Sequence, residues 1–352
     1  MFFETFDTDL TPVFASVILG GLLGVVFGIA AQISRFCLRR GMVAGPDRRQ
    51  ALGTWLTALI VALLGTQLAV AAGWIDFSDH RLHVADLPFV AVIVGGLIFG
   101  AGMVLTRGCV SRLTVLSATG NLRAVTVIVL FAVVAHSALK GLLSPVRVAL
   151  GTPTIGLGDA ASLSGLPGGA PVWTALLALG LAAVVWRSGA RPLHLAMAAV
   201  IGALIPLGWI GTGWFLLDEF DPIPLISLSF TQPWADTLFW TIASTSIPAG
   251  FSTGLVGGVL VGAFLSAAAR RELRLESFET PAQTLRYAGG ASLMGLGGVL
   301  AGGCTVGAGL SGSASLSVAA LIALGSIMAG ARLTDALLTR GRASAGAVLA
   351  AE

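Results

Sequence analysis

Long apolar runs joined by short polar connections make up most of this chain of 352 residues. A helix needs about 20 apolar residues to cross a bilayer. By that measure the chain has nine predicted spans, at residues 13–34, 51–73, 88–106, 122–144, 171–187, 192–216, 247–269, 287–303 and 315–331. The pattern therefore predicts an all-α, polytopic membrane protein.

The charges in the connections predict how these spans are oriented. Arginine and lysine gather in the short loops on the cytoplasmic side of a membrane. The first connection carries five arginines between Arg35 and Arg49, whereas the second carries three aspartates. The alternation continues to the last loop, so residues 1–12 are predicted to form a tail on the outer side and residues 332–352 a cytoplasmic tail.

Composition supports the membrane class and excludes others. Hydrophobic residues make up 56% of the chain and charged residues 11%, whereas a soluble domain has about 25% charged residues. The net charge of +3 is too small to indicate a nucleic-acid partner. The 47 glycines favour close helix packing and irregular backbone within the membrane.

The chain contains an internal repeat. Residues 95–109 (GGLIFGAGMVLTRGC) and 290–304 (GASLMGLGGVLAGGC) share seven residues at the same spacing, including a final Gly-Cys. In the predicted topology one copy runs inward and the other outward. Inverted repeats of this kind bind substrate near the membrane midplane. We therefore expect two inverted halves, at 13–187 and 192–331.

Three isolated cysteines, Cys37, Cys109 and Cys304, end apolar runs. Their wide spacing excludes a CxxC pair and predicts no metal site. We expect breaks between short re-entrant half-helices around them, supported by Gly108, Gly303 and Thr305. Irregular backbone at membrane depth lines a cavity or packs against protein, and a helix that begins there points its N–H groups at an anion.

The three thiols also indicate the kind of anion. A neutral thiol offers a weak donor and a polarizable sulfur, whereas a thiolate would repel an anion. The ligand best suited to these thiols is therefore an anion that carries a soft sulfur atom. Because Cys109 and Cys304 occupy matched positions in the repeat, we expect these two to meet near the midplane. A simple core role is the alternative for each cysteine, and it is strongest for Cys37.

A covalent redox role for the cysteines is a further alternative. It requires a base beside a cysteine or a cofactor motif, and the sequence contains neither, so we predict no enzyme activity and no cofactor. Lys140, four residues after His136, is predicted to reach the outer interface or to attract anions there. The segment 218–246 is predicted to form an outer cap, with Trp234 and Trp240 as interface anchors.

Three segments, RFCLRRG, GAGMVLTRGC and GGVLAGGCTVGAG, resemble the YeeE/YedE sulfur-transport family. The resemblance covers about residues 13–331. It implies an hourglass-like bundle of two inverted halves in the bacterial inner membrane, with a periplasmic N-terminus and thiosulfate as the cargo taken up. It also implies that Cys37, Cys109 and Cys304 pass thiosulfate along by S–H···S hydrogen bonds.

Two features qualify what the resemblance implies. Arg107 and Arg112 flank Cys109 where the family often has small residues, which leaves another sulfur or selenium species open as the cargo. Arg107 is also a candidate for attracting anions. The chain has no appended sulfur-carrier domain, so a cytoplasmic acceptor would be a separate protein.

Overall fold

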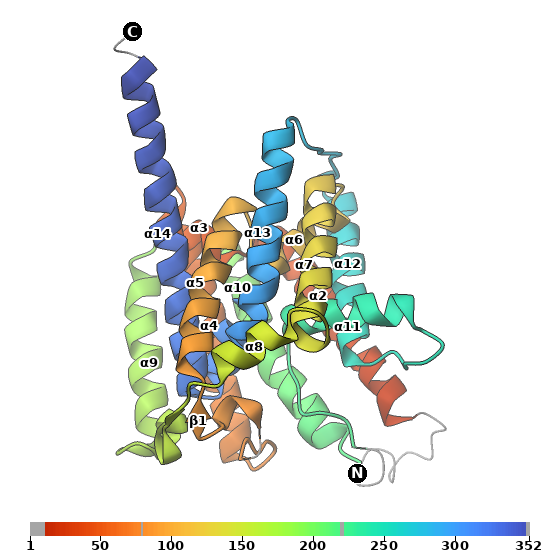
Figure 1. Cartoon of the computed structure of the whole chain (residues 1–352). Helices are drawn as coiled ribbons and strands as arrows, with labels where there is room; N and C mark the ends of the chain where they lie inside the picture. Colours follow the sequence, from red (N-terminus) through yellow and green to blue (C-terminus); the bar gives the residue numbers. More distant parts are fainter. Residues whose placement is uncertain (1–10, 79, 219–221, 350–352) are drawn as a thin grey trace.

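The computed structural model describes residues 11–78, 80–218 and 222–349, with side chains up to residue 340. Nine helices of 17 or more residues form the bundle, and α2 begins at one end of it while α14 ends at the other (Figure 1). They are α2 (Pro12–Ser34), α4 (Arg48–Ala71), α5 (Phe89–Leu105), α7 (Leu122–Lys140), α9 (Gly169–Trp186), α10 (Pro192–Ile210), α12 (Phe251–Ala269), α13 (Pro281–Leu300) and α14 (Val318–Leu349). Each overlaps one predicted span, and the all-α polytopic class is confirmed.

Eight of these nine helices are long and apolar enough to cross a membrane. The exception among the described helices is α13, where we predicted a span at 287–303. Its first turns carry Gln283 and Arg286, which lowers its hydropathy. With 20 residues it is about 30 Å long, and it packs against α5 and α7 inside the bundle.

Three short elements interrupt the bundle, each following a cysteine. They are α3 (Leu38–Met42), α6 (Val110–Ala118) and the π-helix η5 (Gly307–Gly312). Most residues of α6 and η5 are buried. These are the half-helices that the apolar runs with glycine breaks predicted.

The remaining short elements connect the long helices. They are α8 (Ser144–Gly151), α11 (Thr231–Ile242), the π-helix η4 (Gly211–Phe215), the 3₁₀ helices η1 (Arg81–His83), η2 (Gly158–Ala161) and η3 (Leu163–Gly165), and the antiparallel pair β1 (Asp86–Leu87) and β2 (Ile155–Gly156).

The predicted role of Trp234 as an interface anchor is wrong. Within the predicted cap 218–246, residues 231–242 form α11, which packs against α7 and α12. The indole Nε1 of Trp234 donates a hydrogen bond of 2.8 Å to Thr114 Oγ1 on α6. An indole N–H enclosed by protein needs such a partner, so Trp234 supports a half-helix instead of contacting the membrane surface.

Glycines allow the closest helix contacts. A Cβ atom on Gly24 of α2 would overlap the carbonyl oxygen of Leu255 on α12, and one on Gly258 of α12 would overlap that of Gly21. The backbones of these two helices therefore touch along their length, which is the packing that small residues permit in membranes. The α5–α14 pair makes the same kind of contact.

The long helices pack against one another in a regular pattern of pairs. While α2 packs along α12, α10 packs along α4. Similarly, α5 packs along α14 and α13 along α7. The two helices that carry the repeated sequence, α5 and α13, pack against each other in antiparallel fashion, because Gly95 lies against Ala301 and Gly102 against Gly290.

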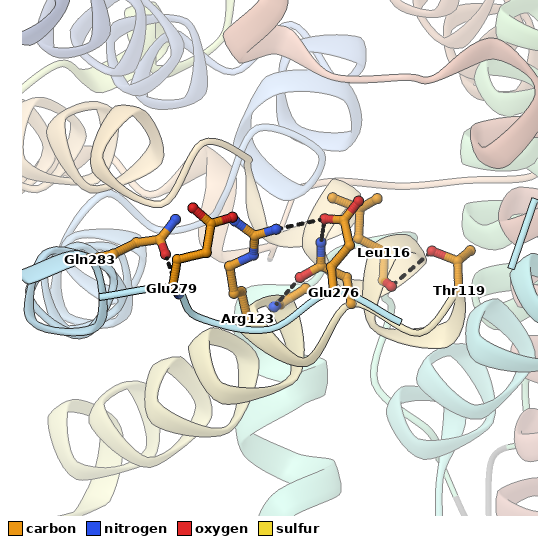
Figure 2. Close-up of polar contacts among 8 residues, drawn as sticks. Leu116, Thr119, Arg123, Glu276, Glu279 and Gln283 are labelled. Atoms are coloured by element: carbon orange, nitrogen blue, oxygen red, sulfur yellow. Dashed lines mark hydrogen bonds and ion pairs between the residues drawn. The ribbon is translucent and has the colours of Figure 1, made fainter. Parts of the chain in front are cut away.

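One loop is fastened to the end of α6 (Figure 2). Glu276, between α12 and α13, accepts hydrogen bonds from Asn121 Nδ2 at 2.7 Å and from Arg123 Nη2 at 3.0 Å. Its backbone N–H also donates to Gly120 O at 3.2 Å, and its carbonyl accepts from Leu122 N at 2.8 Å. We call this contact the Glu276 latch, and it fixes the turn between α6 and α7.

Several predicted features lie partly outside the described residues. Residues 1–10 of the predicted tail 1–12 lie outside them, and so do residues 350–352. Asp79, which contributed to the predicted orientation, also lies outside them. The described part of the predicted tail 332–352 is not a separate element, because α14 continues to Leu349 without a break. In Figure 1 this helix extends past the ends of its neighbours.

Candidate functional site

The Cys109 break follows from how α5 ends. The helix stops at Leu105, Thr106 keeps a right-handed conformation, and Arg107 turns left-handed with φ of 60°. Thr106 Oγ1 donates to the carbonyls of Gly102 and Gly108, at 2.9 and 3.1 Å. These contacts tie the end of α5 to the start of the break, and Cys109 is the N-cap of α6.

The Cys304 break has the same local backbone. α13 stops at Leu300, Ala301 is right-handed, and Gly302 turns left-handed with φ of 73°. Gly303 then packs so closely that a Cβ there would lie 2.6 Å from Ala308 N. In both copies the helix therefore ends four residues before the cysteine, and the left-handed residue lies two before it.

Cys37 lies in a third break. α2 ends at Ser34, Arg35 is left-handed with φ of 53°, and Cys37 is the N-cap of α3. The Sγ atoms of Cys37 and Cys109 are 3.8 Å apart, and Ser111 Oγ lies 3.3 Å from the Cys109 sulfur. Both thiols are free and almost fully buried. The structure thus brings together two cysteines that are 72 residues apart.

Cys304 lies elsewhere, so the expectation that it would meet Cys109 is wrong. Because α5 and α13 are antiparallel, Cys304 follows the end of α13 that packs near Gly95, whereas Cys109 follows the other end of α5. The helix from Gly95 to Leu105 rises about 15 Å. In the described chain Cys304 makes no sulfur contact with another cysteine; its Sγ accepts from Gly307 N at 3.4 Å.

Arg112 gives the cysteine pair a positive charge. It lies in the first turn of α6, which Cys109 caps, and a negative charge at either Cys37 or Cys109 would interact with it. Its Nη1 atom is buried and has no hydrogen-bond partner among the described residues. A buried guanidinium without a counter-charge is costly, and a bound anion would remove that cost.

Two cavities lie beside cysteines, and we name them the outer pocket and the inner vestibule after the predicted orientation of the chain. The outer pocket is the cavity beside Cys304. Gly307, whose N–H contacts the Cys304 sulfur, lines a cavity of about 50 Å³. The polar residues of this outer pocket are His80, Arg81, Ser227, Ser229, Gln232, Ser252 and Ser311. It therefore combines one guanidinium with several hydroxyl groups, which suits a small anion.

The histidines at the outer pocket are held neutral near pH 7. Burial lowers the pKa of His80 to about 4, and the nearby Arg81 adds to this effect. The imidazole packs against Trp209, with ring centroids 5.2 Å apart. Burial also lowers the pKa of His83, whose Nε2 lies 3.1 Å from Ser315 Oγ. Arg81 is thus the principal cation of the pocket at neutral pH.

An inner vestibule lies beside Cys37. This cavity of about 200 Å³ is lined by Cys37 and Phe36, and its charged residues are Arg35, Arg40, Asp47, Arg191 and Arg270, with His194. Three buried phenylalanine rings lie between the two cavities. Phe27 contacts Phe36 at 6.5 Å and Phe230 at 5.1 Å between centroids, and Phe230 directly follows Ser229 of the outer pocket.

Of the other predicted site residues, Arg107, His136 and Lys140 make no hydrogen bond with a cysteine in the described chain. Arg107 is exposed at the end of α5. His136 stacks on Phe239 at 4.6 Å, and Lys140 lines a separate cavity of about 270 Å³ with Asp236 and Trp240. Of the predicted supports, Gly108 packs against Leu113, and Thr305 is buried.

Sequence reasoning missed several residues of this region. Ser111 follows Cys109 by two positions. In a half-helix that starts at the cysteine, the side chain at that position can lie close to the N-cap residue. Arg112 was noted only as unusual for the family. The polar residues of the outer pocket come from distant segments, from His80 to Ser311, and no local pattern reveals such a grouping.

Comparison with known proteins agrees with these features. A family model described as sulphur transport matches residues 33–333, which include all three cysteines. The thiosulfate transporter TsuA of Escherichia coli (strain K12) is 27% identical over 323 residues, covering 84% of this chain and 87% of its own. TsuA of Spirochaeta thermophila is 26% identical over 322 residues, covering 86% and 93%.

The family match extends over most of the chain, and the helices form a multi-pass membrane bundle. The description of the family is transport and not catalysis. This protein therefore belongs to the sulphur transport family, as a membrane transporter and not an enzyme.

Proposed function

We propose that this protein takes up thiosulfate across the bacterial inner membrane. The observation that carries the proposal is a pair of cavities on opposite sides of the three phenylalanine rings, each with a cysteine. Cys37 lines the inner vestibule, and Cys304 lies next to the outer pocket. Thiosulfate has two negative charges and a terminal sulfur. The arginines suit the charges, and the thiols suit the sulfur. Both similar proteins are named thiosulfate transporters.

The proposed path runs from the outer pocket past Cys304 to the Cys109–Cys37 pair and then into the inner vestibule. At each thiol the S–H donates to the terminal sulfur of the anion, and the cysteine stays neutral. The 3.8 Å separation of the Cys37 and Cys109 sulfurs supports transfer between these two. Arg112 supplies the counter-charge at the pair, because its buried Nη1 lacks a partner in the described chain.

The proposed orientation follows the arginine pattern. The inner vestibule is rich in arginine, which supports a cytoplasmic location for it. The N-terminus is then periplasmic and the C-terminus cytoplasmic. The exit beside Cys37 would deliver thiosulfate to a separate cytoplasmic sulfur-carrier protein.

We further propose that the chain consists of two inverted halves, at 13–187 and 192–331. The same backbone at the Cys109 and Cys304 breaks supports this division. The packing of the helices also supports it, because the α2–α12 pair corresponds to the α10–α4 pair. An inverted pair of breaks presents one cysteine toward each side of the membrane.

Growth on thiosulfate tests the proposed function. A bacterium that lacks sulfate and thiosulfate uptake should grow on thiosulfate only when it makes this protein. Uptake of radiolabelled thiosulfate into the same cells should fall when unlabelled thiosulfate is added, and much less with sulfite, selenite or sulfate. Stronger competition by selenite or sulfite would favour a different sulfur or selenium cargo, and the absence of uptake by protein that reaches the membrane would refute the proposal.

A further inference from the structure

The inner vestibule contains more positive charge than its ion pairs neutralise. Of its four arginines, Arg40 pairs with Asp47 at 3.1 Å and Arg270 with Glu272 at 3.2 Å. The guanidinium groups of Arg35 and Arg191 make no hydrogen bond or ion pair with any residue that the structure describes. Two positive charges are thus left over, which equals the charge of one divalent anion.

Arg35 and Arg191 occupy different positions in the helices that carry them. Arg35 lies at the C-cap of α2 in a left-handed conformation, with φ of 53°. Arg191 is the N-cap of α10. A left-handed conformation is less favourable for arginine than for glycine. The break at Cys37 therefore keeps a charged side chain at a position where glycine would relieve backbone strain, and that side chain lines the cavity.

We infer that the inner vestibule is a separate binding site for one divalent tetrahedral oxyanion of the sulfate class. Guanidinium groups bind such anions through paired N–H donors, and the cavity of about 200 Å³ accommodates one. This site recognises charge and not sulfur. The inference rests on the proposed function only for the place of this site at the exit, because the anion binds there without help from a thiol.

The inference has a consequence for selectivity. Sulfate and thiosulfate both fit the charge of the vestibule, so discrimination between them belongs to the thiols beyond it. Cytoplasmic sulfate should occupy the vestibule and slow the release of thiosulfate. The protein would then take up less thiosulfate when the cell already holds sulfate.

Direct binding of radiolabelled sulfate to the purified protein tests the inference. The measurement uses scintillation proximity at low ionic strength, on the unaltered chain and on a variant with Cys37, Cys109 and Cys304 all changed to alanine. Both should bind one sulfate saturably. Arg35→Gln and Arg191→Gln should each weaken this binding about tenfold, as expected for the loss of one charged hydrogen-bond donor.

Matched controls locate the site. Arg49→Gln and Arg187→Gln alter arginines that line a different groove and should leave sulfate binding unchanged. The inference is overturned if the folded protein binds no sulfate saturably, if Arg35→Gln and Arg191→Gln bind normally, or if Arg81→Gln in the outer pocket abolishes binding. Since the variant without cysteines cannot relay thiosulfate, a failure of the proposed transport leaves this result unaffected.

Discussion

The Cys109 and Cys304 breaks share a backbone but have different surroundings. In each, the helix ends four residues before the cysteine, and a left-handed residue lies two positions before it. Cys109 faces a second thiol, a serine and the unpaired Arg112. The Cys304 sulfur, in contrast, has a hydrogen bond only with the backbone N–H of Gly307 among the described residues, and it lies beside the outer pocket.

This difference shows how one local structure can serve two steps. Backbone geometry sets the direction of the cysteine and of the half-helix that follows it. The side chains from other helices decide whether the thiol acts alone or as one of a pair. In the proposed path, Cys304 makes the first contact with the anion, and Cys109 and Cys37 transfer it toward the cytoplasm.

The largest expected effect, beyond that of the cysteines themselves, comes from Arg112. Arg112→Gln should lower thiosulfate uptake about tenfold or more, because a charged hydrogen bond contributes about 1.5–3 kcal/mol. Arg112→Lys should restore part of the rate by returning the charge. Arg49→Gln is the control, since Arg49 lines a separate groove away from the cysteine pair. Equal uptake by Arg112→Gln and the unaltered protein would show that the pair needs no counter-charge.

The buried imidazole of the outer pocket should make the stability of the protein depend on pH. His80 has a pKa of about 4, below its ordinary value of 6.5, so the unfolded chain binds a proton between these values and the folded protein does not. Stability should therefore fall as the pH drops from 6.5 to 4. In thermal unfolding measurements His80→Gln should reduce this fall, and His80→Gln/His83→Gln should reduce it further. A profile unchanged by either variant would contradict the burial of these imidazoles.

The Glu276 latch supports only the Cys109 side, so weakening it should affect the two breaks unequally. Asn121 caps α7 by accepting from Ala124 N at 3.0 Å and also donates to Glu276. Asn121→Ala should cost about 1 kcal/mol, seen as a lower melting temperature. The exposed Thr126→Ala, whose hydroxyl bonds only within α7, is the control and should change the melting temperature little. A similar loss in both variants would argue against the latch.

The smallest effect tests the shared backbone itself. Arg107 and Gly302 occupy the same left-handed position in the two breaks. Arg107→Gly should keep or slightly raise stability, since a left-handed residue other than glycine costs about 1–2 kcal/mol and glycine returns part of this as unfolded-state entropy. Gly302→Ala should lower it by about 1 kcal/mol. A loss of stability in Arg107→Gly, or a gain in Gly302→Ala, measured by chemical unfolding, would show that the two positions are not equivalent.

The sequence predicted the helices well, because apolar runs of about 20 residues are long-range signals that need no tertiary information. The helix ends at Ser34 and Leu105 fall within a residue of the predictions. Short breaks around the cysteines were also predictable from glycine and from the repeated Gly-Cys.

Contacts between distant segments were not predictable in this way. Cys37 meets Cys109 because α2 and α5 end near one another in the bundle, and nothing in RFCLRRG records that. The repeat itself led to the wrong pair: an inverted relation puts equivalent positions at opposite ends of antiparallel helices, so Cys304 cannot lie where Cys109 does. Trp234 was misassigned for the same reason, since its partner Thr114 is 120 residues away.

The most direct test compares binding with transport in two cysteine variants. Purified Cys304→Ala and Cys109→Ala, reconstituted in liposomes, are assayed for binding of radiolabelled thiosulfate added from the outer side and for its uptake. The account predicts that Cys304→Ala loses both, while Cys109→Ala still binds thiosulfate but does not transport it. Uptake at the normal rate by Cys109→Ala, or normal binding by Cys304→Ala, would contradict it.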